Sequence, residues 1–399
     1  MNLVLLLAFR NLTRNAARTV LSSVAVVAGV ALMILGFGLV DGLDENMLRT
    51  QIDSVSGHVL LRAPSVDPDA LGSPITDLEP VPAALEQALE GYRWTPRLHF
   101  DAWLGGGSDV FRARGVGFDP ARDPQVFRRD DFELEGRWPE RGGVVVGARV
   151  AELLGLTVGQ QIHLQARTAR GAINALGYTV EGIVRTRNPI IDNFAVLLPM
   201  EDALDLTRAA GPSVIALRLD ERERADAVAA TLNGSWIAST FREEARDMLE
   251  INRFRRKAIQ FVVFMLMAIA ATGIANTIIM AAYERVREIG TFLALGMSPT
   301  QVRALFLMEG AAMGLVAGGA GGALGAMANG YLSTHGIDFS RLMESAESAL
   351  AFDTMVYTSF SWASVAFAVV FGASIAVIAS WIPAKMASNL DPADAIRAD

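Results

Sequence analysis

The sequence predicts a membrane protein with four transmembrane α-helices and a large α+β extracytoplasmic domain between the first and second helices. Apolar runs with few or no charges occur four times, and each is longer than the roughly 20 residues that cross a bilayer. A charged segment of soluble character, residues 42–255, separates the first run from the other three. The hydrophobic content of 52% and the mean hydropathy of +0.33 fit such a mixture.

The chain is expected to begin with an amphipathic cytosolic helix over residues 1–18. Three arginines lie one turn apart along one stripe of this helix, where they can meet lipid phosphates. They are Arg10, Arg14 and Arg18. The first apolar run is too long for the core of a cleavable signal sequence, so we interpret it as a retained anchor. The four spans are expected at 19–41, 258–283, 299–333 and 358–383.

Charges on either side of the first span predict the orientation. Arginines precede this span, whereas Asp41, Asp44 and Glu45 follow it, so the positive-inside rule places the N-terminus in the cytosol. Four spans then return the tail, 384–399, to the cytosol and leave the loop 334–357 outside with the large domain. A basic cluster between residues 253 and 257 opposes this orientation, but the rule applies weakly after a long translocated domain.

Strand and helix patterns alternate within the large domain, which is typical of α+β structure. We expect βαβ-like units at 56–130 and 211–241, on either side of a β-rich centre at 131–210. Charged residues 242–257 are expected to form a helical stalk that leads into the second span. Strands are expected at 56–63, 111–118, 213–219 and 235–240, helices at 80–91 and 221–232, and a strand–helix–strand sequence at 142–166.

The composition argues against several kinds of chemistry. The sequence has no cysteine, which excludes disulfides, thiolate metal sites and cysteine nucleophiles. Its four histidines lack metal-ligand spacing, and the net charge of −8 argues against a nucleic-acid partner. The nucleotide-binding pattern GxxxxGK[ST] is also missing from the sequence. We therefore expect no catalytic residue, cofactor or metal in this chain.

A short charged segment, residues 284–297, lies between the second and third spans and is expected in the cytosol. Ile289 and Leu293 would share one apolar face of a helix. Phe292 and Leu295 fall toward the charged face, where two bulky apolar side chains suggest a knob for a protein groove. An amphipathic connector at the membrane surface is an equally good interpretation of the same pattern.

The residues after this segment predict a sharp stop and a new start. Gly296 suits the position just beyond the end of a helix. Ser298 and Gln301 fit an S-x-x-Q capping box for the third span, with Pro299 in its first turn. The connector should therefore be a short, well-terminated helix.

Small residues recur every fourth position along the third span. The stripe consists of Gly310, Gly314, Gly318, Gly322 and Gly330, together with Ala326. Such a stripe lets another helix approach backbone to backbone in lipid, either within one subunit or across a dimer. Glu309 lies near the cytosolic end of this span, where we expect solvation at the interface. Asn276 in the second span is expected to bond another helix.

The segment GIANTIIMAAYERVREIGTFLALGMSPTQVRALFLMEG, residues 273–310, resembles the signature of the FtsX/MacB-type ABC transporter permeases. The matching residues are Asn276, Arg287, Glu288, Ile289, Gly290, Ala294 and Gly296. FRNLTRNAARTVLSS (9–23) is similar to the entry helix of that family, and IPAKMASNLDPADAIRAD (382–399) to its tail, with Ile396 where leucine is usual. The resemblance thus extends over essentially the whole chain.

This resemblance implies that the connector is a coupling helix docking onto a separate cytosolic ATPase subunit, which would bind the ATP and Mg. The implied coupling residues are Glu284, Arg285, Arg287, Glu288, Ile289, Phe292 and Leu295. A second permease copy or a paralogue is an implied partner. The implied location is the bacterial inner membrane, with both termini in the cytosol and the large domain in the periplasm. The chain itself would be a non-catalytic, mechanotransmitting subunit.

Two segments of the domain, 116–164 and 178–206, resemble the lipoprotein-releasing Lol-type permeases in particular. This implies that the complex extracts lipoproteins from the inner membrane and passes them to a periplasmic carrier. The carrier-docking loop would include Arg185, Arg187, Pro189 and Asp192. Two alternatives remain open: a MacB-like efflux of a periplasmic substrate through an outer-membrane channel, and an FtsX-like activation of a cell-wall hydrolase.

Overall fold

The structure is a computed structural model that describes residues 16–66, 75–106, 109–129, 132–186, 188–338 and 355–389. The chain divides into two compact units. A helical unit comprises residues 1–45, 250–338 and 356–399, and a sheet unit comprises residues 46–249 and 339–355. The expected entry helix at 1–15 and the tail from residue 390 lie outside the described residues.

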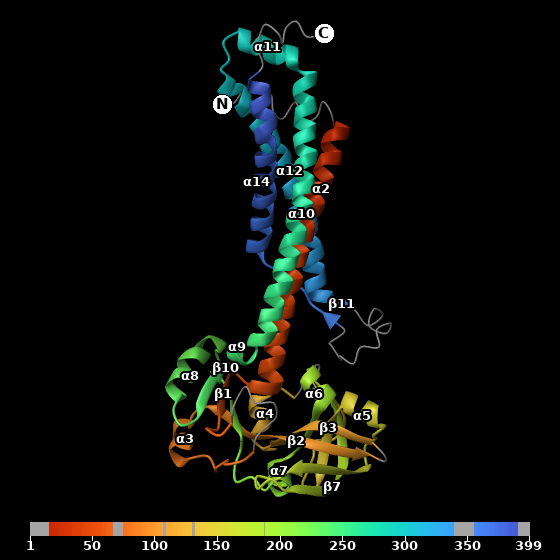
Figure 1. Cartoon of the computed structure of the whole chain (residues 1–399), viewed down its shortest axis with the longest axis vertical. Coiled ribbons are helices and arrows are strands. Elements are labelled where there is room, and N and C mark those ends of the chain that lie inside the picture. The colour runs from red at the N-terminus through yellow and green to blue at the C-terminus, as the bar shows by residue number, and fades with distance from the viewer. Residues whose placement is uncertain are drawn as a thin grey trace. The chain divides into compact units, whose positions relative to one another are not determined.

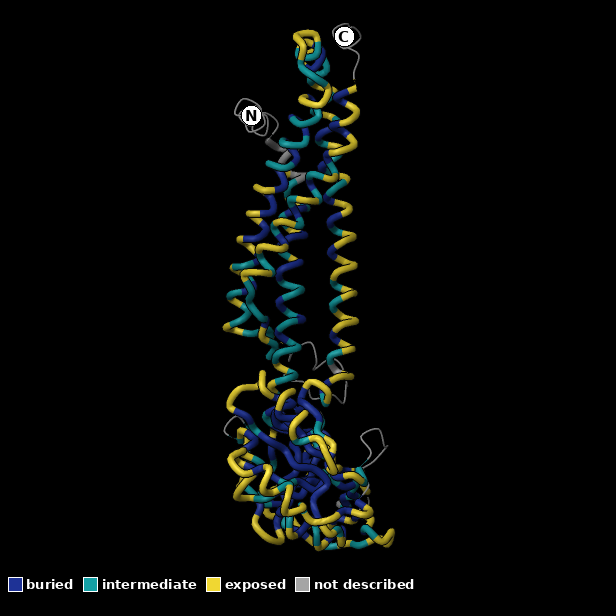
Figure 2. The backbone as a smooth tube through the Cα atoms, turned by 90° about the vertical axis from the view of Figure 1, so that its left-hand side faces the viewer, coloured by how far each residue is buried: buried dark blue, intermediate teal, exposed yellow. Residues whose placement is uncertain are grey.

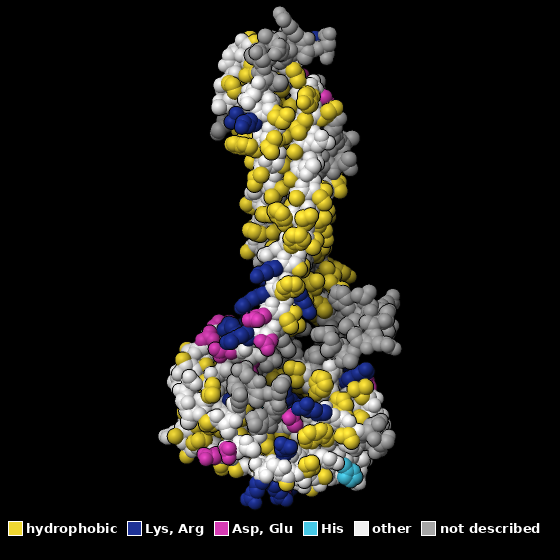
Figure 3. Space-filling model, viewed as in Figure 1, with side chains coloured by type: hydrophobic (Ala, Val, Ile, Leu, Met, Phe, Trp, Pro, Cys, Tyr) yellow, Lys and Arg dark blue, Asp and Glu magenta, His cyan; other side chains and the backbone are white. Residues whose placement is uncertain are grey.

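Among the described residues, four helices are long and apolar enough to cross a membrane. They are α2 (Ala16–Gln51), α10 (Arg246–Glu284), α12 (Pro299–His335) and α14 (Trp362–Ser388). Apolar side chains cover the surface of these helices, as Figure 3 shows for one face. The short helix α11 (Val286–Ala294) follows α10, and the two-residue strands β11 (Ile337–Asp338) and β12 (Met355–Val356) follow α12 (Figure 1). The predicted fold class of four spans and one large inserted domain is confirmed.

The helices of the helical unit pack around a core of buried apolar side chains. Val30 of α2, Met267 of α10 and Ala376 of α14 are each fully buried. Between apolar helices in lipid, association depends on such close packing rather than on hydrophobic burial. Many other residues along these helices are exposed and are coloured yellow in Figure 2. In the span formed by α10, 22% of the residues are buried, the lowest share among the four spans.

The sheet unit contains ten strands in one sheet, with short helices between them. Its elements are η1, a π-helical turn (Ile52–Ser56), β1 (Val59–Arg62), α3 (Ala83–Ala88), β2 (Arg93–Gly106), β3 (Asp109–Phe118), α4 (Asp123–Val126), β4 (Glu133–Gly136), β5 (Gly143–Gly147), α5 (Ala148–Leu154), β6 (Gln161–Arg167), β7 (Ile173–Arg185), α6 (Pro189–Phe194), β8 (Ala195–Pro199), α7 (Met200–Thr207), β9 (Val214–Arg218), η2, a 3₁₀ turn (Arg222–Arg224), α8 (Ala225–Leu232), β10 (Ile237–Thr240) and α9 (Phe241–Glu244). Each strand and helix predicted for this domain overlaps an observed one.

The strand order is β10-β1-β9-β2-β3-β8-β5-β7-β4, and β6 pairs with both β2 and β7. β1 lies antiparallel between β9 and β10, and β9 lies antiparallel between β1 and β2. The expected βαβ-like flanks are therefore β1-α3-β2 and β9-α8-β10. β9 lies between the two strands of the first unit, and β1 lies between the two strands of the second. The two ends of the domain interlock in one sheet rather than standing on either side of its centre.

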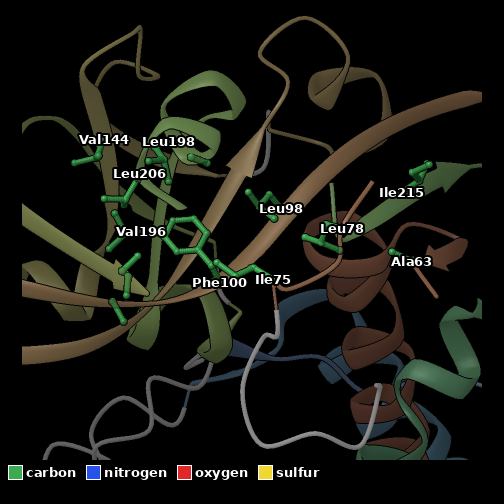
Figure 4. Close-up of a cluster of buried hydrophobic side chains, with 14 of the residues drawn as sticks. Ala63, Ile75, Leu78, Leu98, Phe100, Val144, Val196, Leu198, Leu206 and Ile215 are labelled. Atoms are coloured by element: carbon green, nitrogen blue, oxygen red, sulfur yellow. The ribbon is translucent and has the colours of Figure 1, made fainter. Parts of the chain in front are cut away.

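The core of the sheet unit is formed by apolar side chains from several strands (Figure 4). Leu98 and Phe100 of β2, Val144 of β5, Leu198 of β8 and Ile215 of β9 are all at most 1% exposed. β5 and β8 are buried along their whole length, which agrees with their continuous apolar sequence. This core fixes the strands, and the loops and turns described below are attached to them.

Candidate functional site

Residues close to its two ends define where the connector between α10 and α12, residues 284–297, begins and ends. α10 ends at Glu284, and Arg285 is the N-cap of α11. Gly296, just beyond the end of α11, has a φ of +96°, which L side chains rarely adopt. Ser298 and Gln301 form a capping box at the start of α12. The predicted stop and start are confirmed.

The two faces of α11 differ in burial. Ile289 is 3% exposed and belongs to the apolar core of the helical unit. Leu295, beyond the last turn, is 81% exposed, and Phe292 is half-buried. The exposed charged residues are Glu284, Arg287 and Glu288. Of the residues expected on a docking surface, Ile289 points inward, whereas Phe292 and Leu295 lie beside the charged residues in the sequence.

Arg285 also turns toward the helical unit rather than toward solvent. Its Nη1 lies 3.8 Å from Oε2 of Glu309, and the two side chains are 10% and 8% exposed. The expectation that Glu309 is solvated at the membrane interface was wrong. The carboxylate is buried within the chain because Arg285, at the start of α11, supplies its counter-charge.

The glycine stripe of α12 faces α14. A Cβ atom at Gly310 would lie 1.8 Å from Oγ of Ser380, and one at Gly314 would lie 2.6 Å from Cβ of Ala376. A Cβ atom at Gly318 would lie 3.2 Å from the carbonyl oxygen of Val369 in α14, and one at Gly322 would lie 2.5 Å from Cγ2 of the same valine. A Cβ atom at Gly330 would lie 4.0 Å from the ring of Phe360, just before α14. Within this chain, the stripe allows α12 and α14 to approach backbone to backbone.

A second glycine face on α12 was missed in the sequence. A Cβ atom at Gly321 would lie 2.6 Å from the carbonyl oxygen of Val27, and one at Gly325 would lie 2.9 Å from Cδ1 of Ile34. Both contacts are with α2. The positions fall between those of the first stripe, and the spacing of four between them was the available signal. α12 thus has two faces of small residues, one packed against α14 and the other against α2.

An apolar cleft of about 450 Å³ opens in the helical unit between α2, α10 and α12. Apolar side chains and one glycine form nearly all of its lining. The lining residues are Leu32, Leu35, Gly36, Leu39, Ala258, Ile259, Val262, Val263, Leu266, Leu332, Ile337 and Thr358. A cleft of this composition has affinity for hydrocarbon and few groups that could hold a polar ligand.

Charged side chains lie on α2 and α10 next to this lining. Arg256 forms ion pairs with Asp41 and with Asp44, the latter at 3.4 Å. Nδ2 of Asn252 also donates to Asp44, over 2.6 Å. The basic cluster around residue 256, which opposed the predicted orientation, is therefore partly neutralised by the acidic residues that follow the first span. In the sequence, Asp41 lies two residues after Leu39 and Arg256 lies two residues before Ala258, so these charges belong to the same two helices as the cleft lining.

The expected carrier-docking loop lies between β7 and α6. Arg185 is exposed and forms ion pairs with Glu133 and Glu152, at 3.9 and 3.5 Å. Asp192 is 3% exposed and accepts bonds from the amide and the hydroxyl of Thr186, at 2.7 and 2.9 Å. Asp192 therefore braces the loop from inside, and a part for it in carrier docking stays a prediction.

The expected carrier-docking loop also includes an arginine and a proline. Arg187 lies outside the described residues, and Pro189 begins α6. An apolar residue missed in the sequence lies at the end of α6: Phe194 is 50% exposed and stacks on Phe111 with 6.5 Å between ring centroids.

Among the described residues, no group of three or more His, Asp or Glu side chains is arranged to hold a metal ion.

Comparison with known families matches both parts of the chain. Residues 260–392 match the model of the FtsX-like permease C-terminal domain, and residues 19–234 match that of the MacB-like periplasmic core domain. Together these matches cover the spans, the connector and most of the sheet unit.

Individual relatives agree with the family models. The chain is 22% identical to the lipoprotein-releasing system transmembrane protein LolC of Neisseria meningitidis, over 95% of this chain and 94% of the relative. It is 23% identical to LolE of Haemophilus influenzae, over 94% and 93%. The macrolide export ATP-binding/permease protein MacB of Mannheimia succiniciproducens is 28% identical over 35% of this chain and 19% of its own length.

Proposed function

This chain belongs to the FtsX- and MacB-type family of ABC transporter permeases, and we propose that it is the membrane subunit of a complex that releases lipoproteins from the inner membrane. A separate cytosolic ATPase would bind and hydrolyse ATP. The permease would convert that cycle into motion of its periplasmic domain and pass the lipoprotein to a periplasmic carrier. Both termini would lie in the cytosol.

The apolar cleft of the helical unit is the observation that supports this cargo. An acyl chain is a long apolar group that leaves the bilayer for a site of matching composition, where close packing rather than hydrophobic burial would hold it. The cleft is lined by apolar side chains of α2, α10 and α12, and the ion pairs of Arg256 with Asp41 and Asp44 join α10 to α2, two of these helices. A lipid-modified protein needs both surfaces, one for its acyl chains and one for the polar peptide that follows them. The relatives named as lipoprotein-releasing proteins support the same cargo.

The coupling surface would be the outward side of the connector. Phe292 and Leu295 would enter a groove of the ATPase, with Glu284, Arg287 and Glu288 around them. Ile289 and Arg285 would anchor α11 to the helical unit, so that a push on α11 moves the spans.

A second copy of the chain, or a paralogue, would complete the membrane part. Asn276 is exposed on α10, in a span that is largely uncovered in one chain. An amide facing lipid is costly, and a neighbouring helix that bonds it would remove this cost. We propose α10 as a subunit contact for this reason.

Purification of the tagged protein from its native membranes in mild detergent, followed by mass spectrometry, tests the assembly. We expect an ABC ATPase and triacylated lipoproteins to co-purify. An adaptor and an outer-membrane channel instead of lipoproteins would favour MacB-like efflux, and a cell-wall hydrolase would favour FtsX-like activation. Recovery of the protein without any ATPase would contradict the coupling role.

Filling the cleft tests the cargo site itself. Val262 lines the cleft, whereas Ile269 is exposed on the same helix two turns away and does not line it. In proteoliposomes with the ATPase, Val262→Trp should lower ATP-dependent lipoprotein release by about tenfold, the effect of about 1.4 kcal/mol of overfilling in the cleft. Ile269→Trp is the matched control and should release normally. Equal release by both variants would remove the cleft from the pathway.

A further inference from the structure

The helix α2 ends inside the sheet unit in a π-helical turn, η1, that several distant residues hold. Residues Ile52, Ser54 and Ser56 of η1 are buried. A π-helical turn bonds each amide to the carbonyl five residues back, so local carbonyls are displaced from their α-helical positions. Gly57 ends the turn with a φ of +65°, where any Cβ would lie 2.5 Å from the carbonyl oxygen of Leu217.

One face of η1 is fixed to the sheet by two arginines. Nη1 of Arg97, on β2, donates to the carbonyl oxygen of Ser54 over 3.0 Å. Arg97 is itself held by Asp123 through two bonds of 2.8 and 3.1 Å, with side chains that are 6% and 3% exposed. Arg218, on β9, pairs with Asp53 at 2.9 Å. These charge-assisted bonds tie the end of α2 firmly to the strands.

A third contact leads from η1 to the loop before α6. Nδ2 of Asn188 donates to Oγ of Ser54 over 2.9 Å, and Oδ1 of the same amide accepts from the amide of Ile190 over 2.9 Å. Asn188 and Ser54 are 4% and 2% exposed. One side chain therefore caps α6 and holds the end of α2 at the same time. The backbone amide of Asn188 also donates to Oγ1 of Thr186 over 3.2 Å.

We propose that η1 is a joint through which movement of α2 reaches α6, and that the Ser54–Asn188 hydrogen bond is the contact that transmits it. The inference rests on the proposed function in one respect, namely that ATP binding by a partner moves α2. The arginine contacts hold η1 on the sheet, whereas the Asn188 contact is a single neutral bond to a short helix. A neutral bond of this kind shifts an equilibrium by about two- to tenfold, which suits a contact that guides a movable element.

Hydrogen exchange of the full chain in complex with its ATPase, with and without a non-hydrolysable ATP analogue, tests the joint. In the wild type, the analogue should change exchange in both residues 46–52 and residues 190–194. Ser54→Ala removes the hydroxyl that accepts from Asn188 and donates to the carbonyl oxygen of Thr50 over 2.5 Å, and it leaves the cap of α6 intact. In this variant, residues 46–52 should respond as before, and the response of residues 190–194 should fall by at least about threefold.

Ser56→Ala is the matched control, because the Ser56 hydroxyl bonds to the carbonyls of Gln51 and Gly57 within the same segment. It should preserve both responses. The proposal is overturned if Ser54→Ala keeps the full response of residues 190–194, or if Ser56→Ala loses it equally. It is also overturned if residues 190–194 do not respond in the wild type, or if Ser54→Ala abolishes the response of residues 46–52 as well. No cargo enters this measurement, so a wrong cargo assignment would appear in the release assay alone.

Discussion

At the scale of single residues, the buried charges of the sheet unit are matched to one another. Asp123 accepts from Arg97 and also from Arg129, the latter over 2.8 Å. The guanidinium of Arg97 lies 3.5 Å from the ring centroid of Phe127, and that of Arg129 lies 4.0 Å from that of Trp138. A buried ion that loses its partner costs about 3–5 kcal/mol, so these residues act as one unit. They hold β2 at the place where it meets η1.

His58 gives the sheet unit a predicted pH dependence. Burial, with Arg218 as the next contribution, lowers the pKa of His58, although Asp53 opposes the shift. Nδ1 of the neutral ring accepts from the amide of Leu219 over 3.0 Å. The unfolded chain binds a proton near pH 6.5 while the folded chain does not, so stability should fall as the pH drops below about 6.5. Thermal unfolding of the full chain in detergent, followed between about pH 8 and pH 5, would measure this fall.

His58→Gln keeps an acceptor at this position but cannot take up the proton, so it should reduce the pH dependence without abolishing it, because burial lowers the pKa of His99 to about 3 and leaves a second contribution of the same sign. The same substitution at His163, whose side chain is exposed, is the control. A pH profile of His58→Gln that superimposes on that of the wild type would refute the prediction.

At the scale of elements, α12 is the helix around which the helical unit is arranged. Glycines on one face bring α14 close, and glycines between them bring α2 close. Because dispersion contacts and close backbone approach hold helices together in lipid, each of these positions should be sensitive to added volume. The glycines of α12 do not all share this sensitivity: a Cβ atom at Gly319 would meet nothing within 4 Å.

A paired substitution separates these two kinds of glycine. Gly321→Leu should destabilise the chain by about 1–3 kcal/mol or more, because its Cβ alone would lie 2.6 Å from a carbonyl oxygen of α2. Gly319→Leu should be neutral or stabilising by up to about 1 kcal/mol, since it replaces a poor helix former. Unfolding in a detergent titration measures both. Equal stability of the two variants would contradict the observed packing of α12.

At the scale of the whole molecule, the chain combines a membrane part and a domain that share two continuous helices. α2 runs through both units as the chain enters the domain, and α10 runs through both as the chain leaves it. The connector α11 follows α10 directly, separated by Arg285. An ATPase that acts on α11 is therefore linked by covalent structure and by the Arg285–Glu309 pair to the spans.

Removing the two apolar side chains on the outward side of the connector should disrupt the complex. The double variant Phe292→Ala and Leu295→Ala should weaken ATPase binding by roughly 2–4 kcal/mol, or about 30- to 1,000-fold in Kd. Leu315→Ala with Leu324→Ala is the control, because both side chains are exposed on α12 within the span. Co-purification yield and binding in detergent provide the measurements. An unchanged yield for the connector variant would exclude the coupling surface.

The sequence predicts the parts of this fold that depend on local pattern. Four apolar runs define the spans, and Gly296, Ser298 and Gln301 define where one helix stops and the next starts, because capping is a property of neighbouring residues. Burial of a charge depends on residues far away in the chain. This is why Glu309 was misjudged, and why Asp192 was expected at a surface that it does not reach.

The interlocked sheet and η1 lie beyond such local patterns. Nothing near Ser54 in the sequence indicates a π-helical turn, because Arg97, Asn188 and Arg218 hold it from three separate parts of the chain. The split of each βαβ unit likewise depends on pairing between β1 and β9, which are more than 150 residues apart. Long-range pairing of this kind leaves no periodic signal in a single sequence.

The π-helical turn has a consequence for how this protein can change in length. Such a turn is equivalent to one extra residue accommodated inside a helix. Deleting one residue from Ile52–Ser56 would remove the wide turn, return the segment to α-helical hydrogen bonding and shift its buried side chains relative to the sheet. Ser54 would then leave the reach of Arg97 and Asn188 together. Related proteins should therefore tolerate altered residues in this turn more readily than an altered number of them.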